Sequence, residues 1–443
     1  MLTEKKLPPG NLGFPFLGEA IEQFSTHHLF YWKRFQTYGY VYKTQFVGIK
    51  TICLIGPEAN QFVLQSKANH FSQQGWKFLM PLVGEDGLTL LDGEKHRLIK
   101  DLMYPAFHGE SLNSYLDIIN NTTKSFLSQL DCSEKIPLLE SSRNLILMIS
   151  CYLLLGQKTS SVKINQLSEY FYDLVDGIET VMRIDIPLTK FGRGRIARKK
   201  IEKLFSKIVE INQDILNSKP TTILDFLCKG TNEKGTKLNK DQIVRQMLQL
   251  LYSGYETTSK LITWCIFELY RNKKWLEILK KEQSEKIKSN KLNINSLKEL
   301  ENLTFFIKET ARLYSPAYMF PREVKETLEY KGYLIPKGWL VLVSPLITHR
   351  LPELYTNPNH FDPLRFCSPR KEDKKHPFAF IPFGGGVHRC IGEELAMLQA
   401  KIILLELLRN YEWEINPITY NTIPISDIYN LERSIKIKLK LTR

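Results

Sequence analysis

The chain has 443 residues, 43% of them hydrophobic, which is enough for a large buried core. Its seven cysteines are scattered without a Cys-x-x-Cys pair, which argues against a disulfide framework or a zinc site and predicts a reducing compartment, the cytoplasm. The net charge of +14 at pH 7 favours acidic partners, but no zinc-finger, helix-turn-helix or aromatic-basic RNA motif accompanies it, so we expect no nucleic-acid partner.

The N-terminal part begins with a predicted irregular lead over residues 1–20, because Pro and Gly are too frequent there for a helix or strand. No signal-peptide core and no apolar run of ~18 residues is present, so we predict no transmembrane anchor and at most a peripheral membrane contact. A helix is then expected to stop at Gly39, followed by a hairpin with strands at 41–46 and 51–55 and by a helix that opens at Pro57.

Residues 67–90 form a predicted loop with many apolar side chains, among them Trp76 and Phe78. Gly and Pro interrupt this segment at several positions. Composition leaves two interpretations open, a flap over an apolar ligand or core packed beneath a long loop.

The next predicted helix, 92–107, places His96 and Lys100 one turn apart on one face. A solvated helix face is the alternative interpretation of this pair. Residues 110–290 are predicted to be mostly helical, and the basic stretch at 191–205 is interpreted as a solvated helix start.

A long helix is predicted over 238–271, with an interruption at 252–258. Gly254 weakens the hydrogen-bond ladder there, and hydroxyls such as that of Thr257 compete for backbone carbonyls. Glu256 adds an acid to an otherwise apolar helix. Local conflicts of this kind often mark functional sites.

Acids and bases are paired in the following segments. Glu309 and Arg312 lie three residues apart on one predicted helix face, directly after apolar residues. Arg365 stands in a later Pro-Leu-Arg-Phe segment, and Arg322 precedes strand-like segments that end near residue 344.

The stretch from Pro382 to Gly392 reads Pro-Phe-Gly-Gly-Gly-Val-His-Arg-Cys-Ile-Gly and places Cys390 at the start of a predicted helix. Unpaired backbone N–H groups and the helix dipole are expected to bias this thiol towards thiolate. A thiolate is one of the few protein groups that hold haem iron. For an isolated cysteine, the alternative is an inert residue at an ordinary loop-to-helix junction.

The order Phe-Gly-x-Gly-x-His-x-Cys-x-Gly resembles the haem-binding loop of the cytochrome P-450 family, and the resemblance runs from Pro8 to the strands after Trp413. It implies one catalytic domain over residues 1–443, mainly α with small β-sheets, in the triangular fold of this family. Haem would lie between the long helix around Gly254 and the helix after Cys390. The lead segment, Gly-Tyr-Glu-Thr-Thr and Lys-Gly-Trp-Leu-Val are most similar to the retinoic-acid-hydroxylase branch of cyanobacteria and animals.

The resemblance implies haem b (iron protoporphyrin IX) as the cofactor and Cys390 as its iron ligand. The other residues that would contact the haem or its propionates are Phe383, Gly384, Gly392, His96, Lys100, Arg322 and His388. Arginine is more usual in the family at positions 100 and 388. Lysine supplies the charge of a propionate contact but not the bidentate fork.

On the oxygen side, the resemblance implies that Gly254 widens a groove, Thr257 supplies a hydroxyl and Glu256 relays protons. Ser253 departs from the family motif and adds a hydroxyl beside this groove. Leu351 replaces an acid that the family pattern would have. The residues that would brace the scaffold are Glu309, Arg312 and Arg365.

The activity that the resemblance implies is a monooxygenase that inserts one oxygen atom from O2 into a C–H bond of a long apolar isoprenoid, such as retinoic acid or another apocarotenoid. The expected substrate contacts are Trp76, Phe78, Leu250, Tyr255, Tyr318 and Met319. Electrons would come from an acidic ferredoxin with its reductase, attracted by lysines at 371–375, and the protein would be a monomer. The alternatives that stay open are a hydroxylase of sterols, other terpenoids or fatty acids, a peroxide-using or isomerising haem-thiolate enzyme, a haem-binding sensor, and a helical protein with an inert cysteine.

Overall fold

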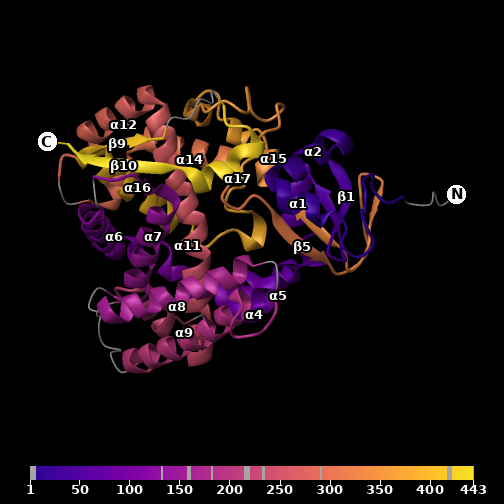
Figure 1. Cartoon of the computed structure of the whole chain (residues 1–443), viewed down its shortest axis with the longest axis horizontal. Helices are drawn as coiled ribbons and strands as arrows, with labels where there is room; N and C mark the ends of the chain where they lie inside the picture. The colour runs from indigo at the N-terminus through magenta and orange to yellow at the C-terminus, as the bar shows by residue number, and fades with distance from the viewer. Residues whose placement is uncertain are drawn as a thin grey trace.

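The computed structural model describes residues 6–130, 133–156, 161–180, 183–213, 220–231, 235–289, 292–416 and 422–442. The predicted fold class, mainly α with small β-sheets, is confirmed. A large helical body lies beside a smaller part that holds α1, α2, β1 and β5 (Figure 1). Free thiols are found at Cys53, Cys151, Cys228, Cys265, Cys367 and Cys390, whereas Cys132 lies outside the described residues.

The helices follow the chain with the bounds α1 Ala20–Thr26, α2 His28–Tyr38, α3 Pro57–Gln61, α4 Met80–Val83, α5 Gly93–Met103, α6 Glu110–Ser128, α7 Leu138–Leu155, α8 Ser161–Glu179, α9 Lys190–Gln213, α10 Ile223–Lys229, α11 Lys240–Arg271, α12 Lys273–Lys286, α13 Ile294–Lys298, α14 Glu301–Tyr314, α15 Pro345–Thr348, α16 Glu393–Asn410 and α17 Ile425–Ser434. The predicted stop at Gly39 and the predicted start at Pro57 are confirmed. The longest helix, α11, begins with a capping box in which Asn239 and Gln242 satisfy each other's backbone N–H groups.

Three small sheets complete the fold. The first has the order β1-β2-β8-β5-β3, with bounds β1 Val41–Phe46, β2 Ile49–Leu54, β8 Leu340–Val343, β5 Phe320–Val324 and β3 Phe71–Ser72. The second has the order β4-β10-β9, with bounds β4 Ile136–Pro137, β10 Lys436–Leu441 and β9 Tyr411–Ile415. The third pairs β6 Leu328–Tyr330 with β7 Tyr333–Ile335. The predicted hairpin is confirmed, with a shorter turn than expected because β2 already begins at Ile49.

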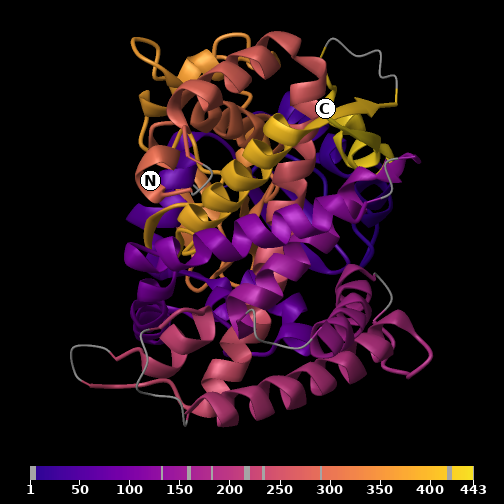
Figure 2. The same ribbon diagram turned by 90° about the vertical axis from the view of Figure 1, so that its left-hand side faces the viewer.

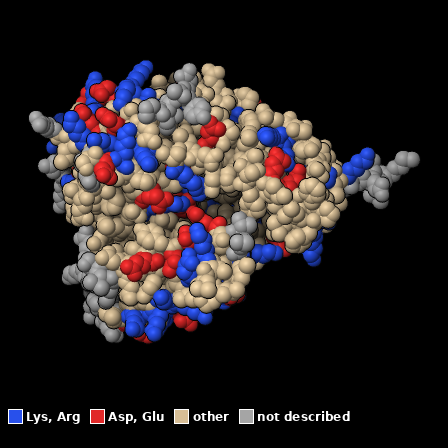
Figure 3. Space-filling view, in the orientation of Figure 1, with Lys and Arg blue, Asp and Glu red and all other residues tan. Residues whose placement is uncertain are grey.

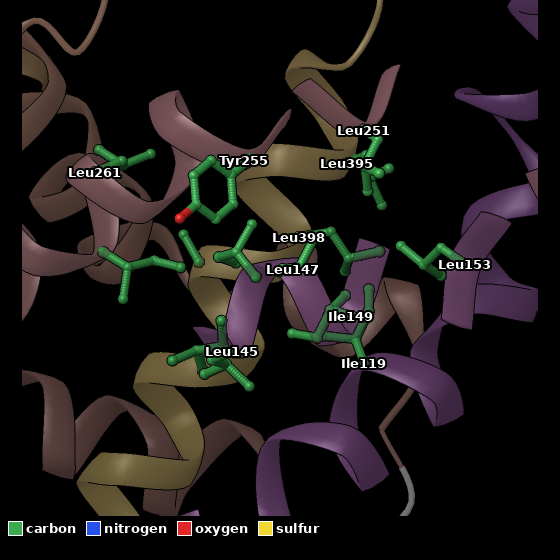
Figure 4. Packing of buried hydrophobic residues seen from close by; sticks show 14 of the residues in the cluster. Ile119, Leu145, Leu147, Ile149, Leu153, Leu251, Tyr255, Leu261, Leu395 and Leu398 are labelled. Atoms are coloured by element: carbon green, nitrogen blue, oxygen red, sulfur yellow. The ribbon is translucent and has the colours of Figure 1, made fainter. Parts of the chain in front are cut away.

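The core of the helical body is built by α6, α7, α11 and α16. Figure 2 shows the gold helix α16 crossing the purple helices α6 and α7 in the middle of the body. Leucines and isoleucines from the four helices meet there, and Tyr255 of α11 points into the same packing (Figure 4). This apolar centre fixes the position of α11 relative to α16 and therefore of the segments that both helices carry.

Among the described residues, α7 is long and apolar enough to cross a membrane by length and mean hydropathy. It is not the uninterrupted apolar run whose absence was predicted, because Glu140 and Arg143 lie within it. Its residues are mostly buried against α6 and α11, and a core helix surrounded by other helices is apolar on all sides for that reason.

Candidate active site

A cavity of about 320 Å³ lies where the middle of α11 faces the loop before α16. Most of the side chains in its wall are apolar. The sequence-predicted residues that line it are Trp76, His96, Leu250, Gly254, Thr257, Arg322, Phe383, Gly384, His388, Cys390 and Gly392. The fold thus brings together residues that are up to 316 positions apart, from Trp76 to Gly392.

Cys390 is accessible from the cavity and otherwise enclosed by protein. Its N–H donates to the carbonyl oxygen of Phe383 at 2.9 Å, and the backbone N–H of Gly392 donates to its sulfur. Burial nevertheless raises the pKa of the thiol, and this outweighs the lowering by Gly392 and by nearby Lys100 and Arg389. The predicted N–H donor to the sulfur is present and lowers the pKa, but burial opposes it and is larger, so a cation at the sulfur is needed to stabilise the anion.

The backbone of the cysteine loop requires glycine at its tightest point. Gly386 has φ +63°, and a Cβ there would lie 1.9 Å from the carbonyl oxygen of Leu64. Lys100 holds the same loop from the other side, because its Nζ donates to the carbonyl oxygens of Val387 at 2.7 Å and Arg389 at 3.1 Å. The structure thus places Lys100 as a brace of the loop, outside the cavity wall.

A cluster of nitrogen donors occupies one end of the cavity, and the carboxylate oxygen Asp92 Oδ1 lies 3.9 Å from His388 Nε2. The rings of His96 and His388 lie 4.0 Å apart, and Arg322 is buried beside them in β5. With its amide oxygen turned towards this cluster, Gln73 accepts from His388 Nε2 and from Arg322 Nε, both at 3.2 Å. Burial lowers the pKa of Arg322 to about 10 and that of His96 to about 4. At pH 7 the two histidines are therefore neutral and Arg322 is the buried cation, and this set of groups is stabilised by an anionic ligand.

These donors fit haem b. A haem carries one iron that needs an axial ligand and two carboxylates that need donors. Cys390 would supply the first, and the cluster of His96, Arg322 and His388 would supply the second. Gly254 would leave room for the flat group, because a Cβ built on it meets no atom within 4 Å.

Helix α11 runs through the predicted interruption without a break. The hydroxyl of Thr257 donates to the carbonyl oxygen of Ser253 at 2.9 Å, so the competing side chain bonds back to the preceding turn instead of opening the helix. Ser253, Gly254 and Thr257 all face the cavity.

Glu256 lies outside the cavity wall, in an ion-pair network between α7 and α11. Arg143 donates to its carboxylate through Nε at 3.0 Å and Nη2 at 2.7 Å, and Lys260 Nζ lies 3.1 Å away. Burial alone would raise the pKa of Glu256, but Lys260 and Arg143 outweigh it and the pKa is lowered from its ordinary 4.5. The carboxylate is therefore held ionised.

A Glu256→Gln variant should be about 1–3 kcal/mol less stable than wild type at pH 7, because it removes the carboxylate that Arg143 and Lys260 share and leaves them only Glu140, Glu179 and Glu432. The folded-state pKa lies below the unfolded value, so the contribution of Glu256 is complete above pH 4.5 and is lost as the pH falls through the lowered pKa. Urea denaturation from pH 7 to pH 3.5 should show the two proteins converging. Glu140→Gln is the matched control, since Glu140 is an exposed partner of the same Arg143. A stability difference between wild type and Glu256→Gln that stays constant from pH 7 to pH 3.5 would contradict the prediction.

The expected substrate contacts divide into two groups. Trp76 and Leu250 line the cavity. The other four lie outside the wall. Phe78 is 44% exposed, and Tyr255 packs edge-on against Phe171 in the core. Tyr318 packs edge-on against His28, and Met319 packs against the cluster that contains Tyr31 and Tyr355. Side chains along a helix or strand point in different directions, so closeness in sequence to a wall residue does not by itself place a side chain in the wall.

Glu309, Arg312 and Arg365 form a fully buried network. Glu309 accepts from Arg312 Nε at 2.7 Å and from Arg365 Nε at 3.0 Å. Arg312 Nη1 also donates to the carbonyl oxygen of His349 at 2.6 Å, and His349 Nε2 accepts the N–H of Ile381 at 2.9 Å. This chain of bonds reaches the residue before Pro382 and thereby supports the cysteine loop. The acid missing at Leu351 is replaced by packing, since Leu351 is buried in the core.

Functional residues that the sequence did not indicate include Arg143, which pairs with Glu256 from 113 positions away, and the cavity residues Thr89 and Gln249. An isolated polar residue in an apolar helix was the only signal for Gln249, and it lies one turn before Ser253.

Comparisons with known proteins agree with this geometry. The sequence model of the family described as Cytochrome P450 matches residues 8–439. The chain is 30% identical over 430 residues to abscisic acid 8'-hydroxylase 4 of Arabidopsis thaliana, covering 95% of this chain and 90% of that protein. It is 31% identical over 436 residues to cytochrome P450 26A1 of Gallus gallus, covering 95% of this chain and 88% of that protein. The solved structure of retinoic acid bound cyanobacterial CYP120A1 is similar with a TM-score of 0.88 and 27% identity, over 99% of this chain and 100% of that chain.

The matches cover nearly the whole chain, and the fold, the thiol and the donor cluster are those that a haem-thiolate site needs. The predicted resemblance is confirmed, and with it haem b as the cofactor, monooxygenase activity, O2 as co-substrate and the need for an electron donor and an apolar substrate. The chain therefore belongs to the cytochrome P450 family.

Proposed function

We propose that this monooxygenase hydroxylates a C–H bond of a long apolar isoprenoid, such as retinoic acid or another apocarotenoid. The observation that carries the proposal is the largely apolar cavity that ends at Cys390. Similarity to an abscisic acid hydroxylase and to a structure with bound retinoic acid supports this substrate class over sterols and fatty acids. One catalytic domain over residues 1–443 is supported by a single family match from 8 to 439.

In this proposal, Cys390 holds the iron, and His96, Arg322 and His388 bind the propionates. The bound haem supplies the oxidising chemistry that activates O2 for insertion into the C–H bond. The apolar wall, including Trp76, orients the substrate and excludes water.

Thr257 is proposed to hold a water for proton delivery, because its hydroxyl donates to Ser253 and its oxygen still accepts a hydrogen bond from the cavity side. Glu256, one residue before it, is proposed to relay protons towards this water from outside the cavity wall. Because Arg143 and Lys260 keep it ionised at rest, it takes up a proton and releases it in each transfer.

A Thr257→Ala variant should form on the order of tenfold less product per O2 consumed, because proton delivery loses its hydroxyl. Oxygen uptake and product are measured together. Thr257→Ser keeps the hydroxyl and should stay close to wild type. Equal product yields for wild type and Thr257→Ala would refute the role.

The electron donor is proposed to be an acidic ferredoxin with its reductase. Segment 371–375 supports this: its three lysines are exposed, whereas Glu372 and Asp373 are buried in ion pairs with Arg365 and Lys308. The face in Figure 3 carries Lys and Arg interspersed with Asp and Glu, without one continuous basic patch. We further propose a cytoplasmic monomer; free thiols such as Cys53 support a reducing compartment.

The test is a titration of the haem-loaded full chain with retinoic acid, β-ionone, abscisic acid, a sterol and a fatty acid, followed by the spin-state shift of the haem. Ligands that bind are then incubated with ferredoxin, reductase and O2, and products are identified by mass spectrometry. Hydroxylation of the isoprenoids is expected. Turnover of the fatty acid or the sterol with no response to the isoprenoids would overturn the substrate assignment.

A further inference from the structure

Three polar side chains form a cluster in the apolar part of the cavity wall. Gln249 of α11 donates through Nε2 to the hydroxyl of Ser253 at 2.7 Å and to the hydroxyl of Thr89 at 3.0 Å. All three residues line the cavity. Gln249 itself is only 2% exposed, and its Oε1 has no hydrogen-bond partner among the described residues.

The cluster is held rigidly in place. Gln246, one turn before on α11, accepts the N–H of Leu88 at 3.0 Å and donates to the carbonyl oxygen of Asp86 at 2.7 Å. Thr89 is therefore fixed against α11 by two glutamines. Gly87 closes over the amide of Gln249, since a Cβ there would lie 2.3 Å from Oε1.

The hydrogen-bond inventory of this cluster leaves donors for a ligand. A hydroxyl that accepts from the amide keeps its own O–H to donate, so Ser253 and Thr89 each retain one donor at the cavity wall. The unpartnered Oε1 of Gln249 is an acceptor and is not satisfied by such a ligand. The two hydroxyl donors, by contrast, are satisfied when they gain an acceptor.

The charge around the cluster decides the kind of acceptor. Within the described part of the wall there is no Asp, Glu or Lys, and the cationic groups Arg322 and Arg389 belong to the cysteine end. A carboxylate in apolar surroundings needs a cation, whereas a neutral carbonyl needs only donors.

Resting on the proposed function, we infer that Thr89 and Ser253, oriented by Gln249, bind a neutral carbonyl oxygen on the reacting end of the substrate, a group that an apocarotenoid ketone has and retinoic acid lacks. Ser253 lies one turn from Thr257, which is roughly 6 Å along the helix. The bound carbonyl oxygen is therefore held about one helical turn from Thr257, so the cluster influences both which substrate binds and where it is oxidised.

The experiment compares β-ionone, a neutral apocarotenoid ketone, with its deoxygenated hydrocarbon megastigma-5,7-diene. Dissociation constants are measured on the haem-loaded full chain by calorimetry and by the spin-state shift. Ser253→Ala and Thr89→Val should each weaken ketone binding about three- to tenfold and leave hydrocarbon binding within about twofold. Gly87→Ala, which displaces the amide, should do the same. Ser150→Ala is the matched control, because Ser150 is a cavity serine with no bond to Gln249.

If the dissociation constants of ketone and hydrocarbon change equally in the variants, or neither changes, Thr89 and Ser253 do not bind the carbonyl oxygen, and the proposed function still stands. If β-ionone, megastigma-5,7-diene and retinoic acid all fail to bind to a wild type with an intact carbon monoxide spectrum, the proposed function is wrong, and the carbonyl-binding role of Thr89 and Ser253 is wrong with it. The carbon monoxide spectrum of each variant confirms that its haem site is assembled.

Discussion

Replacing Cys390 by alanine is expected to abolish monooxygenase activity, with a loss on the order of a thousandfold or more, or about 4 kcal/mol in the barrier. Among the described residues, Cys390 is the cysteine that lines the cavity, as Thr257 does, and alanine has no group that can bind iron. Dithionite-reduced wild type exposed to carbon monoxide should show the red-shifted Soret band of a thiolate-ligated carbonyl. The variant should lose that band and retain no thiolate signature.

Cys367→Ala is the control for this experiment, because Cys367 is a half-buried free thiol outside the cavity wall. It should keep both the spectrum and the activity. A red-shifted band in Cys390→Ala, or its absence in haem-loaded wild type, would show that Cys390 does not bind the iron.

The parts of the site that depend on residues close together in the sequence could be predicted from local patterns. The cysteine loop is a contiguous motif, so its glycines, its helix start and its position in the cavity follow from neighbouring residues. The network of Glu309, Arg312 and Arg365 could also be predicted in part, since Glu309 and Arg312 lie on one helix face. The extension of this network through His349 to Ile381 depends on tertiary contacts and could not be predicted from the sequence.

Helical period explains which oxygen-side residues reach the cavity. The wall residues of α11 are Gln249, Leu250, Ser253, Gly254, Thr257, Thr258 and Leu261, which follow a spacing of three and four. Tyr255 lies two positions from Thr257 and hence on the opposite side, in the core (Figure 4). Applying this period to the sequence would have replaced Tyr255 by Gln249 among the expected contacts.

Electrostatic properties were the least predictable. The ionisation of Glu256 depends on Arg143 from a different helix, and the pKa of Cys390 depends on how deeply the folded chain buries it. A helix start and a neighbouring acid are visible in the sequence, but the burial and the distant cations that oppose or reinforce them are not.

A Glu309→Gln variant is expected to lose roughly 3–5 kcal/mol of stability, because it leaves Arg312 and Arg365 buried without their shared carboxylate. Both guanidinium groups are fully buried and cannot recover the loss by hydration. Urea denaturation of the haem-loaded protein, followed by the thiolate Soret band and by circular dichroism, measures the effect. The matched control is Glu285→Gln, which replaces an exposed partner of Lys281 and should cost no more than about 0.5 kcal/mol.

Because the bonds from Arg312 continue through His349 to Ile381, the Soret band of Glu309→Gln should be lost at a lower urea concentration than the helical signal. Coincident loss of both signals at the wild-type midpoint would show that the network braces neither the fold nor the cysteine loop.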